Sequence, residues 1–357
     1  MPEIKIAERL IGDDYPTYFI ADIGANHDGK LERAKELIHL AAEAGADAAK
    51  FQNFQAPKIV SDYGFEHLEG KQSHQDSWKK SVFEVYQDAS IPFDWTPILK
   101  EECDKAGIHY FSSPYDHESV DMLEPYVPAY KAGSGLMSWP ELLIYMAKKD
   151  VPILVSSGAC ELGEVVENLD AIQEVNEEVV LFQCNTNYTG SEENFDHIHL
   201  NVLKTYAQLF PGVVLGLSDH TSGHAAVLGA VALGARVIEK HFTDDTTREG
   251  PDHPFAMDPE TWADMVARTR ELERAMGSPL KRVADNEKET VYVQRRCLRA
   301  ARDIKEGEVL AREMIDVLRP AAPGAIQARQ MNQVLGTKVV EDIPRGEAFR
   351  WEMLVRA

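Results

Sequence analysis

Short apolar runs alternate with longer amphipathic stretches along most of the chain, from Tyr18 onward. In the amphipathic stretch 31–47, the apolar residues, Leu37 and Ile38 among them, fall on one face of a helix and Gly45 marks its end. Such alternation is typical of βα units around a parallel sheet. The eight apolar runs are YFIADI (18–23), DAAKF (47–51), IHYFSS (108–113), PAYKAG (128–133), PILVSS (152–157), VVLFQC (179–184), VVLGLS (213–218) and RVIEKH (236–241).

Eight strands, each followed by a helix, predict a closed (β/α)8 barrel of the TIM type, an α/β fold, over residues 1–280. An open, doubly wound sheet is the alternative. Sheets of that kind rarely combine eight strands with the absence of a glycine-rich nucleotide turn after the first strand, and no such turn follows the first run here. The pattern therefore favours the barrel.

Charge and repetition separate the last part of the chain from the rest. Residues 281–357 hold 15 Lys and Arg against 12 Asp and Glu, a net charge of +3, whereas residues 1–280 hold 22 against 47, a net charge of −25. In the tail, DIKEGE (303–308) recurs as DIPRGE (342–347) at an offset of 39. The repeat predicts a small second domain over residues 281–357, with paired strands, short helices and internal symmetry.

Composition narrows the class of protein. The chain has 357 residues, of which 44% are hydrophobic and 27% charged, and this balance excludes a disordered protein. Because the net charge is −22 and Lys and Arg form no run longer than a pair, nucleic acid is not an expected partner. No stretch has the apolar core of a signal peptide or the ~20 apolar residues of a membrane span, and the four cysteines lack C-x-x-C spacing. We expect a cytoplasmic protein with reduced thiols and no membrane partner.

Polar residues gather at the C-terminal ends of the predicted strands, where barrels of this kind carry their catalytic groups. Lys50 and Lys131 lie inside otherwise apolar runs, and a buried ammonium group is costly unless an anion meets it. Ser113, Ser134 and Ser156 add neutral donors, so we expect a site for a phosphate or carboxylate. The alternative is that both lysines form internal salt bridges with Asp or Glu.

Two histidines end adjacent predicted strands. His220 ends the seventh strand and His241 the eighth, so both imidazoles should lie on the same rim of the barrel mouth. Two histidines and a carboxylate with open positions are typical of a divalent-metal site, and Asp22 is the best nearby carboxylate. The alternative is a pair of rim histidines held by hydrogen bonds alone.

Motifs from both parts of the chain occur together in one known family. They are ADIGANHDG (21–29), KFQ (50–52), YFSSP (110–114), YKAGSG (130–135), ILVSSG (153–158), GLSDHT (216–221), EKHFT (239–243), GPDHPFAMDP (250–259) and LRPAAPG (318–324). The barrel closely resembles sialic acid (N-acetylneuraminate) synthases, including the related legionaminic and pseudaminic acid synthases and spore-coat polysaccharide synthases. The tail resembles their C-terminal antifreeze-protein-like domain, a SAF domain of the β-clip type.

This resemblance implies a transferase that condenses phosphoenolpyruvate with an open-chain N-acylated hexosamine, giving a nine-carbon 2-keto-3-deoxy sugar acid and phosphate. It implies a divalent metal, manganese, with magnesium and cobalt as alternatives. It also implies a domain-swapped homodimer, in which the C-terminal domain of one subunit closes the active site of the other. The opposite net charges of the two domains favour such docking.

The resemblance also assigns roles to individual residues. The residues expected to bind phosphoenolpyruvate are Lys50, Ser113, Lys131, Ser134, Ser156 and Ser218. Those expected to contact the acceptor sugar are Gln52, Tyr188, Asp252 and, from the other subunit, Arg319. His220 and His241 would bind the metal, which polarises the acceptor aldehyde, while Lys50 and Lys131 stabilise the enol ester and the departing phosphate. Asp22, or a water at the metal, would handle the proton of the attacking water.

Two positions depart from the family. Asp22 stands where the family usually has glutamate, and Leu136, followed by Met137, stands where it usually has an acid. An apolar residue facing the acceptor would suit a methyl or acylamino group, so both N-acetylmannosamine-type sugars and 2,4-diacetamido-trideoxy hexoses are expected acceptors. Two rival interpretations are another phosphoenolpyruvate–aldose synthase, which would lack the repeated tail, and a non-catalytic sugar-binding or assembly protein on the same fold.

Overall fold

The structure, a computed structural model, describes residues 2–70, 74–75 and 78–356. It divides into two compact units, Met1–Gly277 and Ser278–Ala357, which are described separately. The division falls three residues before the boundary predicted at 280, because the long helix α11 (Pro259–Met276) ends there and the chain leaves the barrel.

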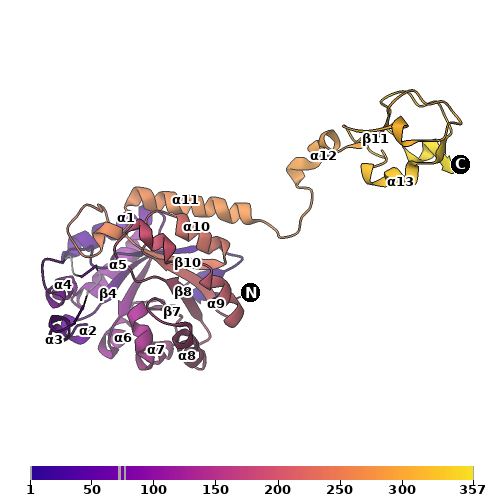
Figure 1. Cartoon of the computed structure of the whole chain (residues 1–357). Coiled ribbons are helices and arrows are strands. Elements are labelled where there is room, and N and C mark those ends of the chain that lie inside the picture. The colour runs from indigo at the N-terminus through magenta and orange to yellow at the C-terminus, as the bar shows by residue number, and fades with distance from the viewer. Residues whose placement is uncertain (1, 71–73, 76–77, 357) are drawn as a thin grey trace. The chain divides into compact units, whose positions relative to one another are not determined.

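The first unit is an eight-stranded parallel barrel surrounded by helices (Figure 1). Neighbouring strands follow the order β5-β4-β3-β10-β9-β8-β7-β6, and β5 and β6, at the two ends of this order, are in contact. The predicted TIM-type barrel is therefore confirmed, and the open sheet is excluded. The strands are β3 (Tyr18–Asp22), β4 (Ala48–Asn53), β5 (His109–Pro114), β6 (Tyr130–Ala132), β7 (Ile153–Ser156), β8 (Val179–Cys184), β9 (Val214–Asp219) and β10 (Ala235–His241).

Helices pack around the barrel because their apolar faces cover the outward side chains of the strands, and together they form the main hydrophobic core. In α1 the buried residues are Ala34, Leu37, Ile38 and Ala41, as the period predicts. The α-helices of this unit are α1 (Leu31–Glu43), α2 (Ala56–Ile59), α3 (Asp62–Glu66), α4 (Val82–Ala89), α5 (Trp95–Ala106), α6 (His117–Leu123), α7 (Pro140–Ala147), α8 (Leu162–Gln173), α9 (Val202–Leu209), α10 (Ala225–Ala232) and α11.

A hairpin closes the N-terminal end of the barrel. Strands β1 (Glu3–Ile6) and β2 (Arg9–Gly12) pair antiparallel, and their side chains Ile4, Ile6 and Ile11 are buried. They pack against inward-facing residues of the barrel, including Phe111 and Phe182, in a second core cluster. This end of the barrel is therefore filled, and polar residues are left to the opposite end.

The second unit contains two similar hairpins that follow the short helix α12 (Lys288–Gln294). Strands β11 (Cys297–Ala300) and β12 (Ile315–Leu318) form one pair, and β13 (Thr337–Val339) and β14 (Leu354–Arg356) form the other. The short helix α13 (Met331–Val334) lies in the segment between the two pairs.

The offset of 39 seen in the sequence is also a symmetry of this unit. Ile304 and Ile343, equivalent residues of the repeat, exchange two backbone hydrogen bonds of 2.9 and 2.8 Å. Asp303 accepts a hydrogen bond from the backbone N–H of Arg345, and its counterpart Asp342 accepts one from that of Glu306. The predicted internal symmetry is therefore present as a two-fold relation between the copies.

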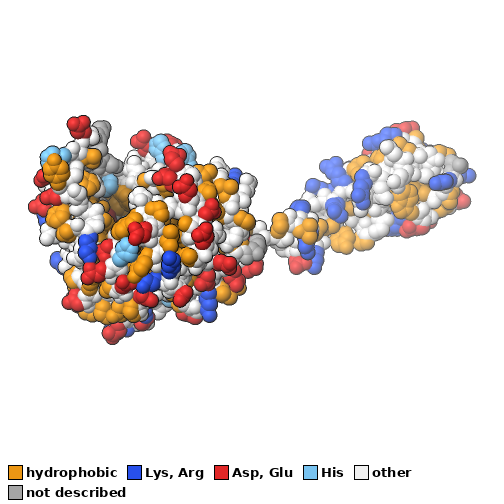
Figure 2. Space-filling view, turned by 90° about the horizontal axis from the view of Figure 1, so that it is seen from below, with side chains coloured by type: hydrophobic (Ala, Val, Ile, Leu, Met, Phe, Trp, Pro, Cys, Tyr) orange, Lys and Arg blue, Asp and Glu red, His pale blue; other side chains and the backbone are white. Residues whose placement is uncertain are grey.

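Acidic side chains are spread over the visible face of the barrel unit, whereas the second unit shows several Lys and Arg side chains (Figure 2). In the described part of the chain, no helix combines the length and the apolar character that crossing a membrane requires.

Candidate active site

A cavity of about 200 Å³ lies at the C-terminal ends of the barrel strands. Strand geometry explains why polar residues meet here, since parallel strands in a barrel all end at the same rim. The cavity brings together eleven of the thirteen residues predicted for the site: Asp22, Lys50, Gln52, Lys131, Ser134, Ser156, Tyr188, Ser218, His220, His241 and Asp252.

Both predicted lysines are buried and both lie near carboxylates. Lys50 Nζ donates to Asp22 Oδ2 at 2.6 Å and lies 3.6 Å from Glu239 Oε1. Burial alone would lower the pKa of Lys50, but these two carboxylates outweigh it and raise that pKa. The internal salt bridges considered from the sequence are thus present, and Lys50 is a neutralised cation.

Lys131 is less fully neutralised than Lys50. Its Nζ donates to Ser156 Oγ at 2.7 Å and to the Ala132 carbonyl at 3.1 Å, whereas the nearest carboxylate oxygen, on Glu239, lies 3.4 Å away. Burial lowers the pKa of Lys131, and Glu239 only partly offsets this. Lys131 is therefore the cation in this cavity with the greatest need of an anionic ligand.

Glu239 is a central residue of the site that was not singled out from the sequence. It lies within 3.6 Å of both lysines and accepts a hydrogen bond from Ser218 Oγ at 3.2 Å, while its Oε2 has no hydrogen-bond partner among the described residues. Its signal was its position two residues before His241 on the same strand, because alternate residues of a strand face the same side.

The predicted serines lie in different surroundings. Ser134 Oγ accepts the backbone N–H of Gly158 at 3.0 Å, an approach that needs glycine, since a Cβ there would lie 2.7 Å from that oxygen. Ser156 and Ser218 contact Lys131 and Glu239, as described above. Ser113, by contrast, is fully buried in β5 and is absent from the described lining of the cavity. The structure thus places three of the four serines at the cavity.

His220 and His241 face each other across the rim, with ring centres 5.5 Å apart. His220 Nδ1 donates to the Asn185 carbonyl at 2.7 Å, because a carbonyl can only accept. Burial lowers the pKa of His220, but its contacts with Cys184 and Asn185 outweigh burial and raise that pKa. His241 Nε2 lies 3.4 Å from Asp22 Oδ2, and burial lowers the pKa of His241 to about 3, so its ring is neutral at pH 7. His241 is therefore in the neutral state that binds a metal.

The described residues contain no preformed group of three or more His, Cys, Asp or Glu side chains arranged to hold a metal ion. Of the two histidines, His241 also has a buried Nδ1 without a hydrogen-bond partner among the described residues. Two imidazoles on one rim, of which His241 is neutral and has a nitrogen unpartnered among these residues, fit a divalent cation whose remaining ligands come from substrate and water.

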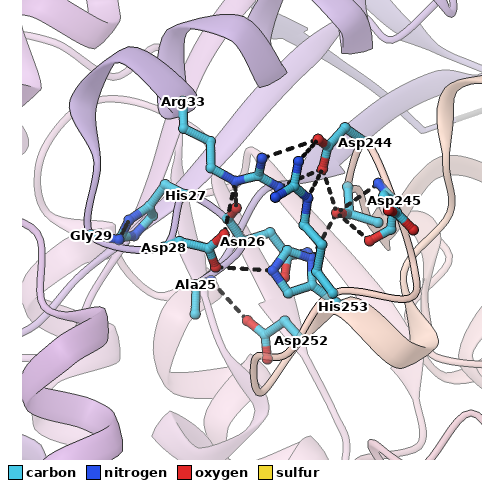
Figure 3. Close-up of polar contacts among 12 residues, drawn as sticks. Ala25, Asn26, His27, Asp28, Gly29, Arg33, Asp244, Asp245, Asp252 and His253 are labelled. Carbon is cyan, nitrogen blue, oxygen red and sulfur yellow. Dashed lines mark hydrogen bonds and ion pairs between the residues drawn. The ribbon is translucent and has the colours of Figure 1, made fainter.

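The outer wall of the cavity combines polar and aromatic side chains. Gln52 Nε2 donates to Asp22 Oδ2 at 3.2 Å, and Asp252 Oδ2 accepts the Ala25 N–H at 2.8 Å (Figure 3). The Tyr188 ring lies 4.3 Å from that of His220. The wall also includes aromatic and apolar side chains from the segment after β4, which sequence reasoning missed because it has no strand period: Phe54, Ile59, Trp78, Val85 and Tyr86.

The structure bears differently on two residues expected at the acceptor, Leu136 and Arg319. We expected Leu136 to face the sugar, but residues Ser134–Ser138 form a 3₁₀ turn that buries Leu136 and Met137 in the core around the barrel. The structure corrects this expectation: the specificity of the cavity cannot be read from Leu136. Arg319 lies in the second unit, exposed at a bend just after β12.

Comparisons with known proteins agree with this geometry. The NeuB family matches residues 37–281, and the SAF domain matches residues 295–355. The chain is 32% identical to the N,N'-diacetyllegionaminic acid synthase of Legionella pneumophila, over 96% of this chain and 95% of that protein. It is 31% identical to human N-acetylneuraminate-9-phosphate synthase, over 97% and 95%.

A solved structure shows the same architecture. The Bacillus subtilis spore coat polysaccharide biosynthesis protein SpsE aligns with a TM-score of 0.65 at 30% identity, and the alignment covers 99% of each chain. The predicted resemblance is therefore confirmed in both parts of the chain. The chain belongs to the NeuB family and ends in a SAF domain.

Proposed function

We propose that this protein is a nonulosonic acid synthase, which condenses phosphoenolpyruvate with an N-acylated hexosamine and releases phosphate. The observation that carries the proposal is Lys131: a buried, incompletely neutralised cation, surrounded by neutral donors, in one cavity with two histidines. The names of the NeuB-family relatives, synthases of legionaminic and N-acetylneuraminic acids, support it.

In this proposal phosphoenolpyruvate binds at the lysines. Lys131, Ser156 and the Ser134 region would hold its phosphate and carboxylate, because an ammonium group and short neutral donors are suited to such oxygens. Lys50 stabilises the enol ester from the other side. Phosphate leaves when the bond between carbon two and the oxygen that carries the phosphorus breaks. The two lysine cations would stabilise the negative charge that moves to the leaving phosphate.

His220 and His241 would hold a divalent cation, manganese or a similar ion. Bound there, the cation would polarise the acceptor aldehyde as a Lewis acid. Carbon three of phosphoenolpyruvate forms the new bond to the aldehyde carbon, whose oxygen gains a proton, and water adds to carbon two before phosphate leaves. Asp22 would accept the proton of that water, and the position of its carboxylate beside Lys50 and His241 supports this role.

The acceptor would lie against the outer wall. Gln52, Tyr188 and Asp252 offer hydrogen-bonding groups, while Trp78 and Tyr86 offer apolar surface. This combination suits a sugar with hydroxyls on one side and acylamino or methyl groups on the other. N-acetylmannosamine-type sugars and 2,4-diacetamido-trideoxy hexoses both fit this description.

We further propose that the working form is a homodimer in which the SAF domain of one subunit supplies Arg319 to the acceptor in the other. The opposite net charges of residues 1–280 and 281–357 support such docking. A cytoplasmic location is proposed as well, supported by four cysteines that are all free thiols.

The deciding experiment measures phosphate release from phosphoenolpyruvate with manganese and each acceptor type, with a chelator control. We expect chelator-sensitive release with one acceptor. In parallel, His241→Ala should lose bound manganese, measured by metal analysis, together with activity. Folded, metal-loaded protein that is silent with every acceptor would overturn the proposal in favour of a non-catalytic binding protein, and full activity of His241→Ala would overturn the metal role.

A further inference from the structure

Two loops at the barrel mouth are joined by a dense set of hydrogen bonds. One loop follows β3 and the other follows β10, and these strands are neighbours, with Asp22 paired to His241. Asn26 Nδ2 donates to the Phe242 carbonyl at 3.0 Å, and the Ala25 N–H donates to Asp252 at 2.8 Å. Figure 3 shows the contact between Ala25 and Asp252, with His253 and Asp28 beside it. The first and last strands of the barrel thus act as one support for Asp252.

His253 lies at the centre of this set and is completely buried. Its Nε2 lies 3.0 Å from Asp28 Oδ1, and its Nδ1 lies 2.7 Å from Thr243 Oγ1. A carboxylate can only accept, so Nε2 carries the proton and Nδ1 accepts from the Thr243 hydroxyl. Because both ring nitrogens are satisfied by fixed partners, the ring has one orientation (Figure 3).

The partner of His253 is itself anchored. Asp28 Oδ2 pairs with Arg33 Nε at 3.0 Å, and Arg33 extends from α1 to contact both carboxylate oxygens of Asp244 in the second loop. Arg248 binds Asp244 as well. A bidentate guanidinium is a geometrically strict contact, so the position of Asp28 is set by the helix and by both loops together.

The consequence for the cavity falls on Asp252, the residue directly before His253. Its carboxylate lies 3.7 Å from His241 Nδ1 and is packed so closely that a Cβ at Gly24 would lie 2.5 Å from its Oδ2. His253 itself is not among the described residues that line the cavity. Any movement of the His253 ring would therefore displace Asp252 without removing a group that faces the substrates.

We propose that His253 is a positioning residue for the acceptor: clamped between Asp28 and Thr243, it holds the Asp252 carboxylate at the sugar-binding wall. This proposal rests on the proposed function for its substrate. It predicts a selective effect on the acceptor, because Lys131, Ser156 and Ser218, which would hold phosphoenolpyruvate, lie on other strands.

The test uses an isosteric change that removes one contact of the ring. Thr243→Val keeps the shape of the buried side chain and removes a hydroxyl that lies 2.7 Å from His253 Nδ1 and makes longer contacts, of 3.3 to 3.4 Å, with Asp244 and Asp245. Thr247→Val is the matched control, since Thr247 lies in the same loop and its hydroxyl bonds only to Asp245 among the described residues. With the best acceptor, Thr243→Val should raise the acceptor KM about tenfold, a change equivalent to one lost hydrogen bond, and leave kcat and the KM of phosphoenolpyruvate within about twofold.

Two substitutions of His253 itself provide a graded test, because one keeps a contact of the ring and the other keeps none. Gln can still reach Asp28 but loses Thr243, whereas Ala loses both, so acceptor KM should rise in the order wild type, His253→Gln, His253→Ala. Equal acceptor KM in wild type and Thr243→Val would overturn the proposal. So would a parallel loss of phosphoenolpyruvate binding and thermal stability, which marks a merely structural role.

A second readout does not depend on turnover. The Ala25 amide donates to Asp252, so its hydrogen exchange reports whether the carboxylate is in place. Thr243→Val should speed this exchange about tenfold, and Thr247→Val should not. If wild-type protein is inactive with every acceptor, the proposed function fails, but unchanged Ala25 exchange in Thr243→Val would separately overturn the positioning of Asp252 by His253.

Discussion

One of the buried histidines, His27, links the pH of the solution to the stability of the barrel. Its Nδ1 accepts the Gly29 N–H at 3.0 Å, and its ring lies edge-on to Trp95 with ring centres 5.7 Å apart. Burial lowers the pKa of His27 to about 4, with the nearby charges of Asp28 and Arg33 acting in opposite directions. The folded protein therefore holds this ring neutral well below pH 6.

Acidification should destabilise the protein through His27. The pKa is lower in the folded state than in the unfolded state, so the unfolded chain binds the extra proton, and stability is lost as the pH falls from about 6.5 to 4. Between pH 7 and pH 5 the loss from this one group is about 2 kcal/mol. Urea unfolding at the two pH values measures it.

The control for this prediction is His27→Asn. Its side-chain oxygen can still accept the Gly29 N–H, but it does not titrate. The free energy of unfolding of this variant should fall less between pH 7 and pH 5 than that of the wild type. An equal fall in both proteins would show that other groups carry the pH dependence.

At this scale the sequence revealed the cations of the site better than their partners. A lysine within an apolar run is conspicuous, so Lys50 and Lys131 could be singled out. Glu239 could not, because a glutamate near a strand end resembles ordinary surface polarity until the barrel closes and brings it between two lysines from other strands. The burial of Leu136 could not be predicted for a related reason. It lies in a short 3₁₀ turn, where the sequence shows no hydrophobic period.

Among the elements, β9 and β10 are joined by a buried ion pair on the side facing away from the cavity. Lys240 Nζ donates to Asp219 Oδ2 at 2.6 Å and to the Thr221 carbonyl at 2.5 Å. Asp219 and Lys240 stand opposite each other in the strand register. Asp219 directly precedes His220, and Lys240 directly precedes His241. The ion pair therefore fixes the positions of the two histidines relative to each other along the strands.

Breaking this pair on one side should be costly. Lys240→Met leaves the Asp219 carboxylate buried and unpaired, and we expect the free energy of unfolding to fall by about 3–5 kcal/mol. Asp219→Asn in the same chain removes the stranded charge while keeping an oxygen for the Thr221 N–H. The double variant should therefore be more stable than Lys240→Met alone in chemical denaturation. Additive losses would contradict this account.

Element prediction succeeded where period and burial agree. The eight strands and α1 were found because their apolar residues follow a period of 2 or 3.6 or fill a short run. Helices α2, α3 and α4 were not found from the sequence, since they have four, five and eight residues, and α2 and α4 contribute side chains to the cavity wall. A helix of one or two turns has too few residues for a hydrophobic period of 3.6 to be recognised in the sequence.

For the whole molecule, the proposed exchange of SAF domains makes a prediction about mixtures of subunits. Lys131→Ala removes the anion site of one barrel, and Arg319→Ala removes the arginine that the other subunit would supply. Each variant alone should be nearly inactive. A 1:1 mixture reassembled from unfolded chains should regain about a quarter of wild-type activity, because half of the dimers are mixed and each has one complete site.

The phosphate-release assay on purified mixed dimers measures this recovery. If Arg319 instead served the barrel of its own chain, no complete site could form in any dimer, and activity would stay at the level of the single variants.

The hairpin that fills the N-terminal end of the barrel also affects the order in which molecules enter and leave the cavity. Phe182 belongs to that filled end, and its ring lies 5.1 Å from Lys131 Nζ, so the proposed anion site rests directly on the plug. Asp252 and Tyr188 belong to loops beyond the strand ends, nearer the entrance. In the proposed reaction, a cavity closed at this end would impose an order: phosphoenolpyruvate would bind at Lys131 before the acceptor, and phosphate would leave after the sugar acid.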